Sequence, residues 1–253
     1  MRAHDGEARP AQSSEPHAVD GVVFDLDGTL VDSCDDIAQA ANFSLNAAGF
    51  ARRSPADIRS FIGDGSRLLL ARASGLAPSD ARVGAMLEQF IAYYTQHVAD
   101  HTRLLPGALE TLEALAHLPR ALCTNKPRVA TLALLQALGI EASFDVVVGG
   151  GDVPHNKPHP APLQRAGELI GVPCRRLVLV GDGPQDVACA RAAGARSIGI
   201  TEAIIVPIEQ LRAAGPDALV ALRDVPAQID AWRRAAGAPS VPATAASVSP
   251  RSA

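Results

Sequence analysis

The sequence predicts an α/β protein whose doubly wound parallel sheet, a Rossmann-like core, carries a helical cap inserted after the first strand. Two observations support this prediction. Short apolar runs alternate with segments of helical periodicity, which is the pattern of strands buried on both faces by crossover helices. A long stretch, residues 34–102, contains helical patterns alone and interrupts that alternation.

Each candidate strand is a short apolar run that ends at a polar residue or at glycine, as expected where a buried strand reaches the edge of a sheet. Continuous apolar runs of this length suit parallel strands. The runs are 22–24, 121–123, 144–148, 177–180, 197–200 and a weaker one at 218–222.

Helices fit between these runs because the intervening segments begin with proline and several are followed by glycine, the expected asymmetry of helix ends. In one of them, Val129, Leu132, Leu135 and Leu138 fall on one face, which we predict to be buried. The prolines that open these segments are Pro106, Pro127, Pro160 and Pro184, and the glycines that close the last three are Gly139, Gly171 and Gly194.

The insert has the size of a small domain and shows helical patterns at 36–48, 66–73 and 79–98. Tyr93 and Tyr94 are predicted to pack within it, and Asp32, Asp35 and Asp36 to cap and charge its first helix. Ends rich in polar or small residues are predicted to be disordered. We expect a core of 19–33 and 103–236, a cap of 34–102, and tails of 1–18 and 237–253.

Composition excludes several classes of partner. A net charge of −4 and a pI near 6.0 give no general attraction to nucleic acid or to an anionic membrane. The chain has no apolar run near the ~18 residues that span a bilayer, and its first residues lack the apolar stretch of a signal peptide. We expect a cytoplasmic protein, a monomer or homodimer, that binds neither nucleic acid nor membrane.

Lysine occurs at two positions only, Lys126 and Lys157, although the chain has 23 basic residues. An ammonium is a compact charge, whereas the guanidinium of arginine is a planar fork. The two lysines therefore indicate places where a compact charge is needed; the alternative is chance.

Polar residues follow the first four predicted strands. In a doubly wound sheet these strand ends meet at one ligand-binding edge. Carboxylates gathered there repel one another unless a cation is present, and a few carboxylates with open coordination positions suit Mg²⁺. The residues expected to converge are Asp25, Asp27, Thr124, Asn125, Lys157, Asp182 and Asp186.

This set of residues predicts a magnesium-dependent phosphomonoester hydrolase. A carboxylate can attack phosphorus and form an aspartyl-phosphate, provided that a second acid protonates the leaving oxygen and later activates water. Asp25 and Asp27, two residues apart across a tight turn at Gly28, can divide those roles. Lys157 and the Thr124 hydroxyl can bind the remaining phosphate oxygens.

Four segments resemble, in order and spacing, the signatures of the haloacid dehalogenase-like superfamily, and the match covers about residues 19–225. They are 25–33 (DLDGTLVDS), 124–127 (TNKP), 157–160 (KPHP) and 181–186 (GDGPQD). The resemblance implies that Asp25 is the nucleophile and Asp27 the acid/base, with Lys157 as the third catalytic residue. It also implies that Mg²⁺ is held by Asp25, the Asp27 main-chain carbonyl and Asp182, with Asp186 orienting metal-bound water or Lys157, and that Gly28, Thr124 and Asn125 line the phosphate site.

The resemblance also narrows the chemistry. Members that act on carbon–halogen bonds lack the second aspartate, and Asp27 is present here. Phosphonate-cleaving members need a cap lysine, and residues 34–102 contain none. Sugar-phosphate mutases share Asp27 and remain a minor alternative.

The insert resembles the cap of phosphoglycolate phosphatases, with 62–66 (IGDGS) similar to their substrate-specificity loop. This implies hydrolysis of 2-phosphoglycolate to glycolate and phosphate, with the substrate carboxylate bound by Gly63, Gly65, Arg67 or Arg72. A cap that moves over the core would gate the site, with hinges near 32–34 and 101–105. The alternatives are a sugar-phosphate phosphatase, for example for N-acetylmuramic acid 6-phosphate, and a catalytically silent binding module.

Two segments depart from the pattern of phosphoglycolate phosphatases. Gly183 stands where a serine is common, and 202–206 (EAIIV) lacks the usual loop that contains glycine and tyrosine. The second departure weakens the prediction of the substrate rather than that of the chemistry.

Overall fold

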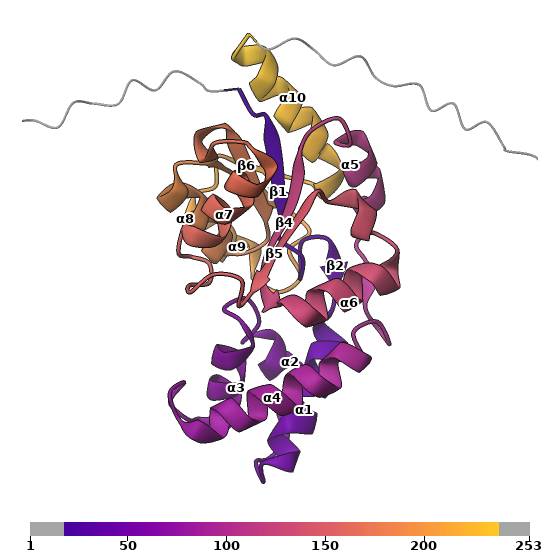
Figure 1. Ribbon diagram of the computed structural model, residues 1–253, viewed down its shortest axis with the longest axis vertical. Helices are drawn as coiled ribbons and strands as arrows, with labels where there is room; N and C mark the ends of the chain where they lie inside the picture. The colour runs from indigo at the N-terminus through magenta and orange to yellow at the C-terminus, as the bar shows by residue number, and fades with distance from the viewer. Residues whose placement is uncertain (1–17, 238–253) are drawn as a thin grey trace, which may run out of the picture.

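The structure is a computed structural model that describes residues 18–237. The predicted tails, 1–18 and 237–253, fall almost entirely outside the described residues. A six-stranded parallel sheet forms the core, and a separate layer of helices lies beyond one end of the strands (Figure 1).

The sheet confirms the predicted doubly wound fold. Its strand order is β5-β4-β1-β6-β7-β8, so successive strands are added first on one side of β1 and then on the other. The order therefore reverses at the central strand, and a ligand crevice is expected at that point. The strands are β1 (Gly21–Phe24), β4 (Arg120–Pro127), β5 (Val146–Gly150), β6 (Leu177–Gly181), β7 (Arg196–Ile200) and β8 (Ala218–Val220).

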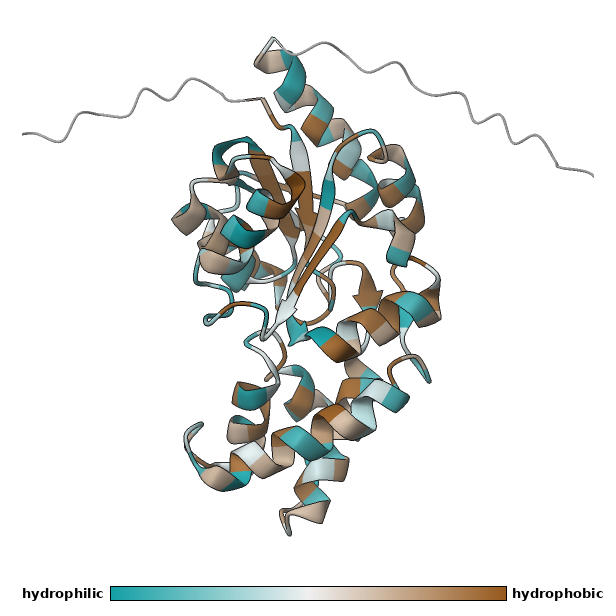
Figure 2. Ribbon diagram, viewed as in Figure 1, coloured by the Kyte–Doolittle hydropathy of each residue, from teal (hydrophilic) through white to brown (hydrophobic). Residues whose placement is uncertain are grey.

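Helices cover both faces of the sheet because successive side chains on each buried strand point to opposite faces. Val22 and Phe24 belong to one apolar cluster and Val23 to the other. Figure 2 shows hydrophobic colour over much of the strands, with paler or hydrophilic sections toward their ends. The helices of the core are α5 (Ala108–Ala114), α6 (Arg128–Leu138) and α10 (Val225–Ala235) toward the first cluster, α7 (Ala161–Ile170) and α8 (Pro184–Ala193) toward the second, and α9 (Ile208–Ala214) beside α8.

Three details differ from the sequence-based expectations. The run predicted at 144–148 forms β5 two residues later, and α9 and α10 were not predicted. In α6 the predicted buried face is partly wrong, because Val129 is 50% exposed. The helix buries Leu135 as predicted, but together with Ala130, Thr131 and Leu134. Among residues 18–237, no helix combines the length and apolar character needed to cross a bilayer.

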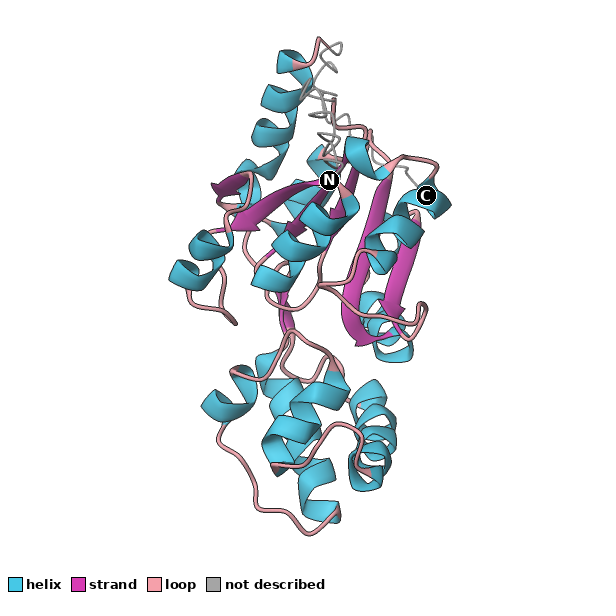
Figure 3. Cartoon of the chain, turned by 90° about the vertical axis from the view of Figure 1, so that its left-hand side faces the viewer, coloured by secondary structure: helices cyan, strands magenta, loops and turns pink. Residues whose placement is uncertain are grey.

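The insert consists of helices that pack together below the carboxyl ends of the strands (Figures 1 and 3). They are α1 (Cys34–Ala47), α2 (Pro55–Arg59), α3 (Ser66–Ser74) and α4 (Ala81–Gln96). Of these, α2 was not predicted, although Ser54 and Asp57 form a capping box around Pro55, a recognisable start signal. The division into core and cap is our proposal from this arrangement.

The chain crosses between the two layers twice, and the two crossings pair with each other. β2 (Val31–Asp32) and β3 (Arg103–Leu104) form a short antiparallel ribbon. Leu105 N also donates to Leu30 O at 2.9 Å. This ribbon was not predicted, because two-residue strands carry no periodicity that a sequence can reveal.

The predicted capping role is wrong for Asp36, which ties the crossings together instead. Its carboxylate is buried and accepts hydrogen bonds from the main-chain N–H groups of His101 (3.0 Å) and Thr102 (2.8 Å) and from Thr102 Oγ1 (2.7 Å). These donors lie on the segment that returns to the core. Asp36 therefore holds the start of the cap against its end.

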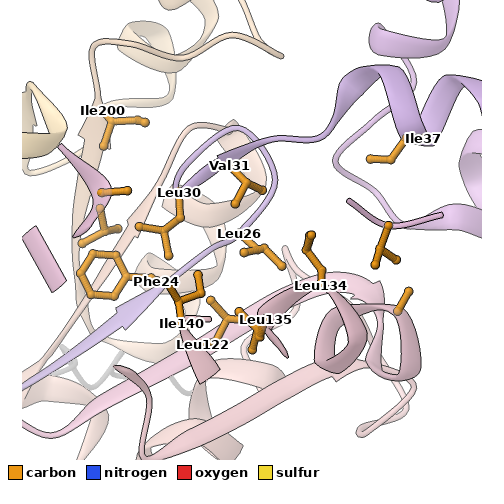
Figure 4. Packing of buried hydrophobic residues seen from close by; sticks show 14 of the residues in the cluster. Phe24, Leu26, Leu30, Val31, Ile37, Leu122, Leu134, Leu135, Ile140 and Ile200 are labelled. Carbon is orange, nitrogen blue, oxygen red and sulfur yellow. The ribbon is translucent and has the colours of Figure 1, made fainter. Parts of the chain in front are cut away.

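The apolar core continues through the loop after β1 and into the cap. Figure 4 shows Leu26 and Leu30 of this loop among side chains from β4 and α6, with Ile37 of α1 nearby. All three side chains are buried. Cap and core thus share one apolar cluster in this conformation, and the cap is closed over the core.

We predict that Asp36→Ala destabilises the protein by about 3 kcal/mol, because it leaves buried N–H groups without acceptors. A loss of that size lowers the melting temperature by roughly 6–12 °C in a domain of this size. Thermal unfolding of purified variants measures it. Asp35→Ala is the matched control, because Asp35 lies in the same helical turn but is exposed. Equal melting temperatures for the two variants would contradict the assigned role.

Candidate active site

The loop after β1 divides its side chains between the core and the site. Leu26 and Leu30 are buried in the apolar cluster, while Asp25 and Asp27 line a cavity at the end of the sheet. Asp25 N donates to Val180 O at 2.9 Å, which fixes the loop to β6. The alternation of carboxylate and leucine is what lets both carboxylates reach the cavity while the leucines stay in the core.

Gly28 makes this tight loop possible. Its φ of +83° is a conformation that side chains rarely adopt. A Cβ at this position would lie 2.2 Å from Asp182 Oδ2. Gly28 therefore lets the first strand's loop approach the carboxylate that follows β6.

Lys157 is the buried cation at the centre of the site. Its Nζ lies 2.9 Å from Asp25 Oδ1 and donates to Asp186 Oδ1 at 2.7 Å and to Cys123 O at 2.7 Å. Burial opposes its charge, but Asp186 and Asp25 raise its pKa well above the usual value. Lys157 therefore stays protonated and orients two carboxylates at once.

Asp25, Asp182 and Asp186 place one carboxylate oxygen each within 4.8 Å of one another. Thr29 Oγ1 donates to Asp182 Oδ1 at 3.2 Å, whereas Asp182 Oδ2 is buried and has no hydrogen-bond partner within residues 18–237. A buried oxygen without a partner costs free energy. A cation bound between the three carboxylates would supply that partner, so the residues present fit a divalent metal ion.

The pKa values of this cluster point the same way. Burial raises the pKa of Asp25 from 3.8 to about 6, against the opposing effect of Lys157. Burial, with the charges of Asp25 and Asp186, also raises the pKa of Asp182 well above its usual value. Carboxylates in this condition bind either a proton or a cation.

The Asp27 carboxylate turns away from this cluster. Its Oδ1 accepts hydrogen bonds from Ser33 Oγ at 2.5 Å and from Lys126 Nζ at 2.6 Å. The side chain lines the cavity between core and cap, as Asp25 does, whereas Asp182 and Asp186 do not line it. The carboxylates of Asp25 and Asp27 therefore have different hydrogen-bond partners, although the two residues are only two positions apart in the sequence.

Lys126 is a site residue whose role the sequence analysis missed. Its ammonium is fully buried, is paired with Asp27, and lies 4.6 Å from the centre of the Tyr94 ring. The scarcity of lysine was the available signal. Both lysines of the chain are buried in contact with site carboxylates, as the hypothesis of compact charges requires.

Asn125 links the core to the cap. Its side chain donates to Gly63 O and Lys157 O and accepts from Lys157 N, each at 2.9 Å. These side-chain contacts were not predicted from the sequence. Thr124 lines the cavity beside it, and its Oγ1 accepts from Lys126 N at 3.2 Å.

The cap residues predicted to bind substrate separate into two groups. Gly63 and Gly65 line the cavity with Asp25 and Asp27. Arg67 does not, because its guanidinium is exposed, donates to Pro78 O at 3.3 Å and faces a neighbouring open cleft of about 860 Å³. Arg72 also lies outside the cavity, in an ion pair with Asp64 at 2.5 Å.

The cavity between cap and core is small, about 40 Å³. That is room for roughly three water molecules. The cap contributes mainly apolar side chains to its wall, Ile37, Ile62, Leu69 and Phe90, together with Tyr94. Tyr94 was predicted as cap packing only; it is buried among cap helices and also lines this cavity.

The two departures from the expected pattern have local explanations. A Cβ at Gly183 would lie 2.1 Å from the Gln185 side chain, so Gln185 occupies the space that a serine would need. Ile205, from the unusual 202–206 segment, approaches to 2.8 Å of a Cβ at Gly28. The segment thus covers the outer side of the catalytic loop.

Comparisons with known sequences agree with this geometry. A family profile described as haloacid dehalogenase-like hydrolase matches residues 22–200. The phosphoglycolate phosphatase of Pectobacterium atrosepticum is 38% identical over 193 residues, which cover 74% of this chain and 82% of that protein. The phosphoglycolate phosphatase of Yersinia pestis is 40% identical over 189 residues, with coverages of 73% and 82%.

Solved structures share the fold, cap included. A predicted phosphoglycolate phosphatase from Haemophilus somnus 129PT has a TM-score of 0.72 at 30% identity and covers 84% of this chain and 97% of its own. A hydrolase from Pseudomonas syringae has a TM-score of 0.71 at 27% identity, with coverages of 83% and 98%.

We predict that Mg²⁺ stabilises the protein more at pH 7.5 than at pH 5. Because the folded-state pKa of Asp25 is raised from 3.8 to about 6, folded Asp25 holds its proton more tightly than the unfolded chain does. The metal-free protein therefore loses stability as the pH rises through this window, and below it protons compete with the metal.

Thermal unfolding with and without Mg²⁺ at the two pH values measures this difference. At saturating Mg²⁺ and pH 7.5 we expect a rise of roughly 5–10 °C. Asp182→Asn should abolish the rise, while Asp35→Asn, an exposed matched control, should keep it. An equal rise at both pH values would contradict the prediction.

Proposed function

This chain belongs to the haloacid dehalogenase-like hydrolase family, and from that premise we propose that it is a phosphoglycolate phosphatase. The reaction is hydrolysis of 2-phosphoglycolate to glycolate and phosphate through an aspartyl-phosphate on Asp25. The observation that carries the proposal is the single buried group of Asp25, Asp182, Asp186 and Lys157 at the switch point of the sheet.

The charges of this group suit a bound divalent cation. Three carboxylates and one ammonium leave two negative charges, which one divalent ion balances. We propose Mg²⁺, held by Asp25, the Asp27 main-chain carbonyl and Asp182, since Mg²⁺ prefers a few carboxylates and substrate oxygens. When bound, the cation draws charge from the phosphate and favours attack on phosphorus.

The protein residues then divide the work. Asp25 Oδ1, oriented by Lys157, attacks phosphorus, and Lys157 and Thr124 stabilise charge on the phosphate oxygens. Asp27 donates a proton to the leaving oxygen and later accepts one from the water that hydrolyses the intermediate. Because Asp27 lines the small cavity, we propose that the leaving group occupies it.

The size of that cavity supports a small leaving group. A cavity of about 40 Å³ favours a small substrate such as 2-phosphoglycolate over a hexose derivative. A sugar-phosphate phosphatase would need the cap to sit further from the core. The names of the relatives from Pectobacterium and Yersinia favour the same substrate. We further propose a cytoplasmic enzyme, monomeric or homodimeric, that binds no nucleic acid.

We predict Mg²⁺-dependent phosphate release from 2-phosphoglycolate that exceeds release from hexose phosphates at equal concentration. Asp25→Asn should reduce it to background because the nucleophile is lost, and Asp35→Asn should not. A phosphate-release assay over a panel of phosphomonoesters, with and without Mg²⁺, provides the measurement. Equal turnover of hexose phosphates would contradict 2-phosphoglycolate as the preferred substrate. If no ester released phosphate, the protein would instead be a catalytically silent binding module.

We predict that Lys157→Ala lowers kcat by about 10²–10³-fold, or on the order of 3 kcal/mol, by analogy with the loss of one oxyanion donor. Steady-state kinetics with 2-phosphoglycolate would measure the loss, and circular dichroism would establish that the variant is folded. Turnover close to that of the wild type in a folded variant would refute the catalytic role of Lys157.

A further inference from the structure

Tyr94 of the cap and Lys126 of the core form a polar corner of the cavity, whose other cap side chains, apart from Ser66, are apolar. Tyr94 comes from α4 and is 1% exposed, and its hydroxyl has no hydrogen-bond partner in the part of the chain that the structure describes. A buried hydroxyl left without a partner is costly, and native proteins rarely leave one. The missing partner is therefore expected to come from a ligand.

Lys126 stands opposite this hydroxyl on the core side. Its ammonium lies 4.6 Å from the centre of the Tyr94 ring, near enough to act on the pKa of the hydroxyl, and donates to Asp27 Oδ1 at 2.6 Å. An ammonium has three protons to donate. Within residues 18–237, Lys126 is also the single cation that lines the cavity, beside the two carboxylates Asp25 and Asp27.

We propose that Lys126 and Tyr94 determine specificity by binding a carboxylate on the leaving group, one carbon away from the ester oxygen. This inference rests on the proposed function and names the groups that select the substrate. Asp27 must reach the ester oxygen to protonate it, and Lys126 contacts Asp27. A carboxylate two bonds from that oxygen therefore falls beside the ammonium and the phenol.

The charge of Lys126 explains how the site would select an anionic leaving group. An anionic leaving group beside Asp25 and Asp27 is repelled unless a cation faces it, and Lys126 supplies that cation. Burial raises the pKa of the Tyr94 hydroxyl, so the phenol stays protonated. It can therefore donate a hydrogen bond to the substrate carboxylate. The arginines first expected to bind the carboxylate are engaged elsewhere, Arg67 at Pro78 O and Arg72 at Asp64.

The test compares two esters that differ at the tail, 2-phosphoglycolate and 2-hydroxyethyl phosphate, in Tyr94→Phe and Lys126→Met. Losing one hydrogen bond to a charged group should lower kcat/KM for 2-phosphoglycolate about 10-fold in Tyr94→Phe, with little change for the neutral ester. Lys126→Met should lower the ratio of the two kcat/KM values about 100-fold. It should also slow both esters, because Asp27 loses a partner.

Ser33→Ala is the matched control. Ser33 is the other donor to Asp27 Oδ1 but does not line the cavity. It should therefore slow both esters by the same factor and leave their ratio unchanged. If Tyr94→Phe and Lys126→Met also leave the ratio unchanged, the proposal is overturned and Lys126 is a positioning residue for Asp27 alone.

A binding measurement separates this proposal from the proposed function. In an Asp25→Asn background, calorimetry should show that Lys126→Met weakens 2-phosphoglycolate about 10-fold or more while the affinity for 2-hydroxyethyl phosphate is retained. If the wild-type protein showed no turnover but the selective binding were observed, the proposed function would be contradicted and the carboxylate site would stand. Equal weakening of both ligands would sink the site, whatever the turnover.

Discussion

The requirement that buried charges be balanced locally governs this protein. Lys157 holds Asp25 and Asp186 in one orientation, and Lys126 holds Asp27 in another. Without the lysines, carboxylates this deeply buried would stay protonated or force the strand ends apart. The two ammonium groups thus hold neighbouring aspartates on different partners, as the proposed division into a nucleophile and an acid/base requires.

The sheet supplies the geometry that this balance needs. Asp25 follows the central strand and Asp182 follows β6, next to it, so the reversal of strand order brings them to the same crevice. Leu26 and Leu30, anchored in the core, prevent the loop between them from shifting. Side-chain alternation in one short loop therefore joins the stability of the core to the placement of the nucleophile.

Much of this was predictable from sequence because the signals are local. Apolar runs revealed the strands, and polar residues at their ends revealed the site. The roles of Asp36 and Asn125 could not be predicted, since their partners lie at Thr102 and Gly63, far away in the chain. Tyr94 looked like packing because burial and ligand contact leave the same apolar pattern, and Lys126 was noticed only through the scarcity of lysine. Arg67 was expected at the site on resemblance, but its side chain points to the open cleft.

The paired crossings between β2 and β3 have a mechanical consequence. Two separate linkers would let the cap slide and twist as well as rotate, whereas a ribbon closed by Asp36 acts as one strap with a single easy axis. A cap that opened on such a strap would return to the same position. Its polar contacts with the core, such as the one between Gly63 and Asn125, would then re-form without a search over alternative arrangements.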